Sequence, residues 1–144
     1  MRGRMIASVF AAAALFVLPA CADVSKAKEG ATEPAEMVPF EGSGQEAIVV
    51  QPEAVKRLRI ETAAVEAGAR AGRTMLPSAA VFYGVDGETW IYTNPDVNTY
   101  LRVPIVVEDI EGETAHVRGG PEPGTQVVVV GAPELFGVEE GVDH

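Results

Sequence analysis

The chain has 144 residues, a formal charge of −10, one cysteine and two histidines. This length suits one small domain with accessory segments, and a single cysteine excludes a framework of disulfides within the chain. The acidic balance argues against nucleic acid as a partner. The one basic cluster, Lys56-Arg57-Leu58-Arg59, has no interleaved aromatic residues for stacking on bases, so we interpret it as a solvated face.

Residues 1–20 have the composition of a secretory signal. Two arginines precede an apolar run that is too short to span a bilayer and that ends in small residues. The boundary Leu18-Pro19-Ala20-Cys21 resembles the lipobox of bacterial lipoproteins, in which the cysteine is acylated and becomes the new N-terminus. The alternative is an ordinary signal that is cleaved near a cysteine. Because Cys21 would then be an unpaired thiol in an oxidising compartment, we expect lipidation.

The lipobox resemblance implies where the mature protein resides. Cleavage before Cys21 would leave 124 residues with a formal charge of −12, and acyl chains on Cys21 would anchor them to a membrane facing the periplasm. Ala22 is not the aspartate associated with retention at the inner membrane in enteric bacteria, so the outer membrane is favoured. Residues 21–45 are rich in Ala, Glu, Gly, Ser and Pro, which predicts a lipidated cysteine followed by a disordered tether.

A folded domain is expected at residues 46–137, with an acidic tail at 138–144. Short apolar runs alternate with turns there, which predicts a mainly β fold, a small β-roll or barrel-like sheet with one or two short helices. Pro52 suits the first position of a helix that is expected to continue over 53–60. A loop is expected at 66–72. The expected strands are 47–50, 62–65, 79–83, 89–93, 100–107, 114–118 and 126–130, with turns at 84–88, 94–98, 108–113 and 119–124 and a helical turn at 131–136.

The stretch 76–107 is predicted to organise the sheet. Its first two strands flank an Asp-Gly turn and should form a hairpin. Apolar residues fall on both faces of the hairpin, so both faces must be covered. Trp90 lies in mid-strand among apolar neighbours and is expected in the core. Pro104 cannot donate a ladder hydrogen bond, which places it at an edge or with its nitrogen facing outward.

Three motifs occur in an order that resembles a known family. They are Leu76-Pro77-Ser78-Ala79-Ala80-Val81, Trp90-Ile91-Tyr92 and the run from Pro123-Gly124 to Gly131-Ala132. Together they resemble the membrane-proximal domain of periplasmic adaptor subunits of RND efflux pumps, the membrane fusion protein family. The family carries β-barrel, lipoyl and α-helical hairpin modules where this chain has only Glu66 to Arg73. We therefore expect that this chain cannot bridge a pump to its outlet alone.

The resemblance implies a non-enzymatic, lipid-anchored module without a cofactor that docks to an RND transporter, its adaptor or another envelope component. Candidate contacts are Tyr100, Arg102 and Pro104, together with the 94–98 loop, because aromatic and arginine residues often anchor interfaces. A remnant without a partner is another interpretation. A further alternative is a ligand- or metal-binding lipoprotein that hands cargo to an export system. A pocket lined by Trp90, Tyr92 and Tyr100 would favour cargo, whereas an open strand edge or a flat apolar patch would favour docking.

Residues with catalytic or metal-binding chemistry are few. His116 with Ser78, or the pair Glu108-Asp109, could serve an enzyme, but strand and turn positions explain them better, so we expect no catalysis. Thioether and imidazole ligands suit copper(I) or silver(I). The candidates lack ligand spacing, so no metal site is expected; they are Met37, Met75, His116 and His144.

The lipidation hypothesis predicts the behaviour of a Cys21→Ser variant. This variant should lose acylation and move to the soluble periplasmic fraction, because the serine hydroxyl cannot replace the thiol. Metabolic labelling with a fatty acid, followed by fractionation, checks this. Wild-type protein that takes up no label would contradict the hypothesis.

Overall fold

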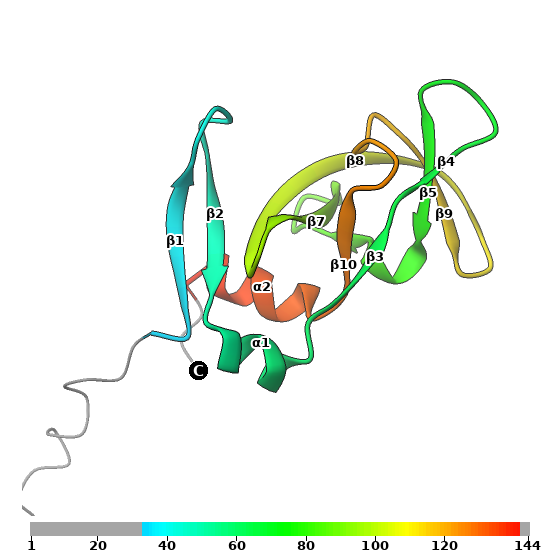
Figure 1. The fold of residues 1–144 in the computed structure, drawn as a ribbon. Helices are drawn as coiled ribbons and strands as arrows, with labels where there is room; N and C mark the ends of the chain where they lie inside the picture. Colours follow the sequence, from blue (N-terminus) through cyan, green and yellow to red (C-terminus); the bar gives the residue numbers. More distant parts are fainter. Residues whose placement is uncertain (1–32, 142–144) are drawn as a thin grey trace, which may run out of the picture. The chain divides into compact units, whose positions relative to one another are not determined.

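The computed structural model describes residues 33–141. These residues form a nearly closed, barrel-like sheet with two α-helices, which confirms the predicted mainly β fold (Figure 1). No helix in this part of the chain is long and apolar enough to cross a bilayer. The strands are β1 (Ala35–Phe40), β2 (Gln45–Val50), β3 (Glu61–Ala64), β4 (Glu66–Ala67), β5 (Arg73–Pro77), β6 (Phe82–Tyr83), β7 (Thr89–Asp96), β8 (Thr99–Glu111), β9 (Thr114–Arg118) and β10 (Gln126–Val130). The helices are α1 (Pro52–Leu58) and α2 (Ala132–Glu139), with a 3₁₀ turn, η2, at Ser78–Ala80.

The barrel closes because its two end strands are one segment of chain. The strand order is β3-β10-β7-β8-β9-β5-β4, and only Val65 separates β3 from β4. The Val65 amide donates to the Thr125 carbonyl at 2.9 Å, and the Gly124 amide donates to the Val65 carbonyl at 2.8 Å. The segment therefore pairs with β10 at one end and with β5 at the other.

The long strand β8 connects the two halves of the sheet. It pairs with β7 along its first part and with β9 from Val106 onward. The register shifts between Val107 and Asp109, and such a bulge increases the local bend of a strand. Figure 1 shows β8 arching from the side of the β1–β2 hairpin to the side of β5 and β9.

One hydrophobic core fills the barrel interior. In β5 and β9 every second residue is buried, as expected for strands with one face toward a core. Full burial of each large aliphatic side chain stabilises the fold by about 1.5–3 kcal/mol. The buried members of this core are Val65, Leu76, Ala80, Ile91, Ile105, Ala115, Val117 and Val127.

A second core covers the outer face of β7 and the start of β8. It contains residues from β2, α1, β7, β8, β10 and α2, namely Ile48, Val50, Ala54, Tyr92, Tyr100, Val128, Ala132 and Leu135. Ile91 and Tyr92 are adjacent in β7 and both are 0% exposed, because each faces a different core. The expectation that both faces of the hairpin are covered is therefore confirmed.

Gly131 lets α2 follow β10 directly and fold back onto this second core. Its φ of 95° is strained for residues with a side chain. A Cβ atom there would lie 2.8 Å from the Ile60 Cγ1 atom. Both constraints require glycine.

The prediction of a disordered tether at residues 21–45 is wrong for its second half. Residues 35–40 form β1, which pairs in an antiparallel ladder with all of β2. Ala35 and Met37 pack against the second core, although the surrounding composition is typical of a linker. The folded domain therefore begins before residue 46. The predicted signal, Cys21 and the first part of the tether lie outside the described residues.

Other boundaries also differ from the predictions. The loop expected at 66–72 includes β4, because its first residues close the barrel. Of the strand expected at 79–83, only Phe82 and Tyr83 form a strand, β6, whereas residues 79 and 80 belong to the turn η2. β8 continues through much of the turn expected at 108–113. The prediction of an acidic tail from residue 138 is wrong for residues 138 and 139, because α2 continues through Glu139.

Two buried threonines give a matched test of the packing. Thr93 is 6% exposed and its hydroxyl donates to the Leu101 carbonyl at 3.2 Å, whereas Thr74 is 9% exposed and its hydroxyl has no partner among the described residues. Thr93→Val should lower the free energy of unfolding by about 1 kcal/mol, and Thr74→Val should leave it unchanged or raise it. Urea denaturation of both variants measures the difference. An equal loss in both would contradict this interpretation.

Candidate docking surface

The three predicted contact residues do not share one surface. Tyr100 is 3% exposed, faces Ile48 across the β2–β8 ladder and belongs to the second core. This burial is incompatible with the predicted contact through Tyr100. Burial also raises the pKa of the Tyr100 hydroxyl, so this hydroxyl stays neutral.

Arg102 and Pro104 lie on the outer face of β8 and do come together with a third residue, Trp90. Trp90 is directly opposite Pro104 in the β7–β8 ladder, and such pairs place their side chains on the same face. The Arg102 guanidinium carbon lies 4.7 Å from the centre of the Trp90 ring. Val106, two residues beyond Pro104, is 48% exposed. We call Trp90, Arg102, Pro104 and Val106 the β8 surface.

Trp90 is half-buried, so its predicted place in the core is wrong. Ile91 fills the barrel interior beneath this strand, and Tyr92 fills the second core on the opposite face. Trp90 shares the face of Tyr92 but lies two residues before it, where Arg102 covers its ring. A cation over an aromatic face contributes about 0.5–1 kcal/mol at exposed sites.

The backbone of β8 is open beside this surface. The β2 ladder reaches only Thr99 and Tyr100, and the β9 ladder begins at Val106, so residues 101–105 pair with β7 alone. Threonine hydroxyls of β7 donate to the Leu101 and Ile105 carbonyls, so these carbonyls face β7. By the alternation of an antiparallel strand, the backbone groups of Arg102 and the nitrogen of Pro104 face the open side. The prediction that Pro104 lies at an edge or has its nitrogen facing outward is met by its nitrogen, because β8 itself lies between β7 and β9 in the sheet.

A small polar network joins the β8 surface to α2. Glu139 accepts a hydrogen bond of 2.7 Å from the Tyr92 hydroxyl, and its other oxygen lies 3.2 Å from Arg102 Nε. Burial, together with the hydrogen bond to Glu139, raises the pKa of Tyr92 well above its ordinary value near 10, so the phenol remains a donor. Sequence reasoning placed Glu139 in the tail and missed this network. The acidic side chain at the end of an apolar helix was the available signal.

A recess lies beside the β8 surface. It has a volume of about 280 Å³ and is lined by Met37, Gln45, Glu46, Trp90, Arg102 and Glu139. Tyr92 and Tyr100 are buried and do not line it. The pocket of three aromatic residues that would favour a cargo protein is therefore not formed.

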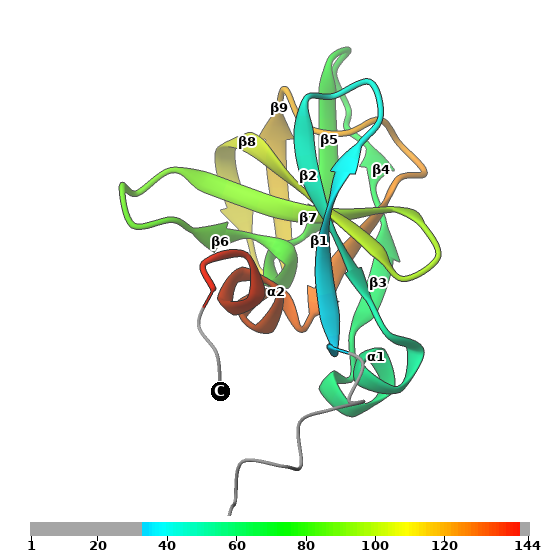
Figure 2. The ribbon, with the colours of Figure 1, turned by 90° about the vertical axis from the view of Figure 1, so that its left-hand side faces the viewer.

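Most of the predicted 94–98 loop belongs to β7, and only Val97 and Asn98 form the turn into β8. The Asn94 side-chain amide donates to the carbonyls of Asp96 at 2.6 Å and Thr99 at 2.9 Å, and Asn98 adopts a φ of 56°. Val97 at its tip is 79% exposed. Figure 2 shows this turn and the β6–β7 turn projecting on opposite sides of the sheet. Its exposed apolar tip makes it a second candidate contact.

The residues considered for catalysis are separated. Ser78 begins η2, where its amide donates to the Glu113 carbonyl at 2.8 Å. His116 lies on β9, with its Nε2 atom 3.5 Å from a Glu111 oxygen. The Glu108 carboxylate forms an ion pair with Arg73 and so has a structural role. Ser78 and His116 thus lie in a turn and a strand, whereas Glu108 lies within β8 and not in the turn expected there.

The residues considered for metal binding are only partly brought together. Met75 and His116 are opposite each other in the β5–β9 ladder, whereas Met37 lies on β1 and His144 lies outside the described residues. Within residues 33–141 there is no group of three or more His, Cys, Asp or Glu side chains placed to hold a metal ion.

Comparison with protein-family models, with curated proteins and with solved structures found no match to this chain. The resemblance to efflux adaptors therefore rests on the sequence motifs alone.

The Glu139 network predicts a difference between neighbouring glutamates. Glu139→Gln should lower the free energy of unfolding by about 1–2 kcal/mol, because a charged acceptor shared by Tyr92 and Arg102 is lost. Glu140→Gln is the matched control, since Glu140 is exposed and its side chain makes no ion pair within the described part of the chain. Chemical denaturation compares the two. Equal stabilities would show that the network contributes nothing.

Proposed function

We propose that this chain is a non-enzymatic, lipid-anchored docking module of the cell envelope, related to RND efflux adaptor subunits. In this proposal Cys21 carries the anchor, the domain faces the periplasm from the outer membrane, and the β8 surface binds an efflux transporter, its adaptor or another envelope protein. The observation that carries the docking role is the open backbone of β8 next to Trp90 and Arg102.

The β8 surface has the features of a preorganised contact. Tryptophan and arginine are enriched among residues that dominate binding energy. Arg102 is already held between Trp90 and Glu139, so a partner would meet side chains that have lost much of their rotamer freedom. The adjacent backbone N–H and C=O of Arg102 offer two hydrogen bonds to an extended segment.

The recess beside this surface gives less support to the alternative of a cargo-binding lipoprotein. Its volume of about 280 Å³ is at the lower limit of ligand pockets, which enclose roughly 300–1,000 Å³. Its lining includes three charged residues, Glu46, Arg102 and Glu139. Docking of a protein surface fits these properties better.

Site-specific crosslinking tests the proposal. A photoreactive residue replaces Pro104 in the full-length chain in intact cells, because Pro104 is exposed and Tyr100 is not. We expect a discrete product that contains an efflux component or another envelope protein. The same residue at Glu53, which is exposed on α1, should give no such product. Failure to capture any envelope protein at position 104, with the domain shown to be folded, would contradict the proposal.

A Trp90→Ala variant separates binding from folding. Because Trp90 is half-buried, we expect the variant to remain folded, with a stability loss below the roughly 3–5 kcal/mol of a core aromatic truncation. The crosslink at position 104 should decrease at least about tenfold, as for a hot-spot residue, and Trp90→Phe should restore part of it. A folded Trp90→Ala variant with undiminished crosslinking would exclude Trp90 from the contact.

A further inference from the structure

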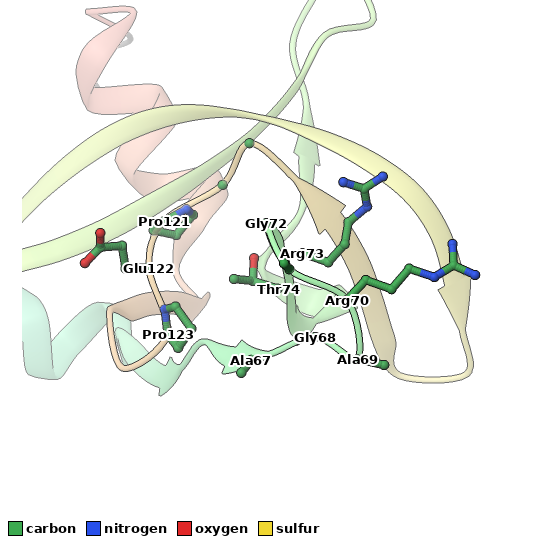
Figure 3. A pocket seen from close by; sticks show the side chains of 13 residues that line it. Ala67, Gly68, Ala69, Arg70, Gly72, Arg73, Thr74, Pro121, Glu122 and Pro123 are labelled. Carbon is green, nitrogen blue, oxygen red and sulfur yellow. The ribbon is translucent and has the colours of Figure 1, made fainter.

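The outer face of β5 and β9 carries two side chains that can act as metal ligands. Met75 on β5 is directly opposite His116 on β9. In both strands every second residue is buried, and Met75 and His116 belong to the half-buried residues between them, so both face outward. Figure 3 shows the side chains of Arg73 and Thr74 leaving β5 in different directions, and Met75, two residues after Arg73, lies on the face of Arg73.

The phase of the ladder brings the two side chains close together. The Ser78 amide donates to the Glu113 carbonyl at 2.8 Å, so Ser78 and Glu113 continue the β5–β9 ladder as a hydrogen-bonded pair. The two kinds of pair alternate in an antiparallel ladder, which makes Met75 and His116 a non-hydrogen-bonded pair. The Cβ atoms of directly opposite residues are about 4.5–5.5 Å apart and are closer in pairs of this kind, so both side chains can reach one ion.

Packing within the domain does not explain Met75. Methionine commonly fills irregular gaps in a hydrophobic core, and Met37 packs against the second core in this way. Met75 belongs to neither of the two cores that residues 33–141 form. Its thioether is therefore available to a ligand on the outer face of the sheet.

A carboxylate favours the histidine tautomer that a metal ion requires. His116 Nε2 lies 3.5 Å from a Glu111 oxygen. A carboxylate beside one ring nitrogen favours the proton on that nitrogen, which leaves the other nitrogen, here Nδ1, free to bind. Histidines that bind metals usually direct their second N–H to a carboxylate, a carbonyl or water.

Acidic residues flank the pair on both sides. Glu66 on β4 is opposite Met75, and Asp109 on β8 is opposite His116. The row across the four strands β4, β5, β9 and β8 therefore reads acid, thioether, imidazole, acid. Such flanks favour a bound cation.

Two arginines on the same face do not reverse this balance. Arg73 forms an ion pair with Glu108, and Arg118 Nε lies 3.9 Å from the other oxygen of the same carboxylate. Together with Glu66, Asp109 and Glu111, the carboxylates on this part of the sheet outnumber the guanidinium groups.

We infer that Met75 and His116 bind one monovalent soft metal ion, copper(I) or silver(I). Thioether ligands select such ions, whereas carboxylate and water suit magnesium and calcium. Two protein ligands suffice for a monovalent ion of this kind, while zinc sites use three or four. Within residues 33–141 His, Cys, Asp and Glu side chains form no such larger set. The inference goes beyond the proposed docking function and depends neither on the anchor nor on the β8 surface.

Titration with silver(I) tests the inference, because silver(I) has the ligand preference of copper(I) and is not oxidised in air. The protein is the full-length Cys21→Ser variant, since a free thiol would itself bind silver. Its methionine methyl groups carry ¹³C, and the buffer contains no chloride. We expect a saturable shift of the Met75 methyl signal and of the His116 ring signals at one equivalent of silver. The Met37 methyl signal should not move with them.

Substitutions at the two ligands and at a matched methionine complete the test. Met75→Leu and His116→Asn should each weaken silver binding at least about tenfold, the loss that even an outer-shell partner of a metal site causes. Met37→Leu should leave the affinity unchanged. The amide spectrum of each variant checks its fold, which should persist because Met75 and His116 lie outside both cores.

Three results would overturn the inference. They are the absence of a saturable Met75 shift, undiminished binding by folded Met75→Leu or His116→Asn protein, and an equal loss of binding in Met37→Leu. None of them affects the crosslink at position 104, so the docking proposal and the metal site fail separately.

Discussion

The closure of the barrel through Val65 is the constraint on which the rest of this domain depends. A strand that is shared between β10 and β5 fixes where both ends of the sheet lie, because the chain itself joins them. β8 must then bend to serve both halves, and it does so at its bulge after Val107. That bend leaves residues 101–105 with one neighbour, so the open edge beside Trp90 follows from closure.

The two cores explain why the domain needs helices at all. A closed barrel buries only its inner face, and β7 has apolar residues on both faces. Tyr92 on the outer face is covered by β6 and α2 together. The Phe82 ring of β6 stacks on Tyr92 at 5.1 Å, and the Phe136 ring of α2 lies 5.8 Å from Phe82. Glu139 then connects the end of α2 to Tyr92 and Arg102, so the β8 surface and the helix share one polar network.

The sequence predicted the fold class and most strands because local patterns determine them. The alternation in 114–118 and the valine run in 126–130 correspond closely to β9 and β10. Tyr100 and Trp90 exchanged roles, with Tyr100 buried and Trp90 half-exposed, because their burial depends on β2 and α2, which are distant in the sequence. β1 was not predicted because its sequence has only a weak strand pattern, and it forms a strand by pairing with β2.

Prolines lie at two strand edges that have no partner within the described residues. Pro39 lies on β1, which pairs only with β2, and Pro104 lies on the open part of β8. Prolines at exposed edges oppose uncontrolled pairing between copies of a sheet, because they interrupt the row of donors. Between residues 101 and 105, the open side of β8 offers one backbone N–H, that of Arg102, because Pro104 contributes only its C=O. A partner that paired with β8 would therefore gain little affinity from a ladder and would need side-chain contacts, such as those offered by Trp90.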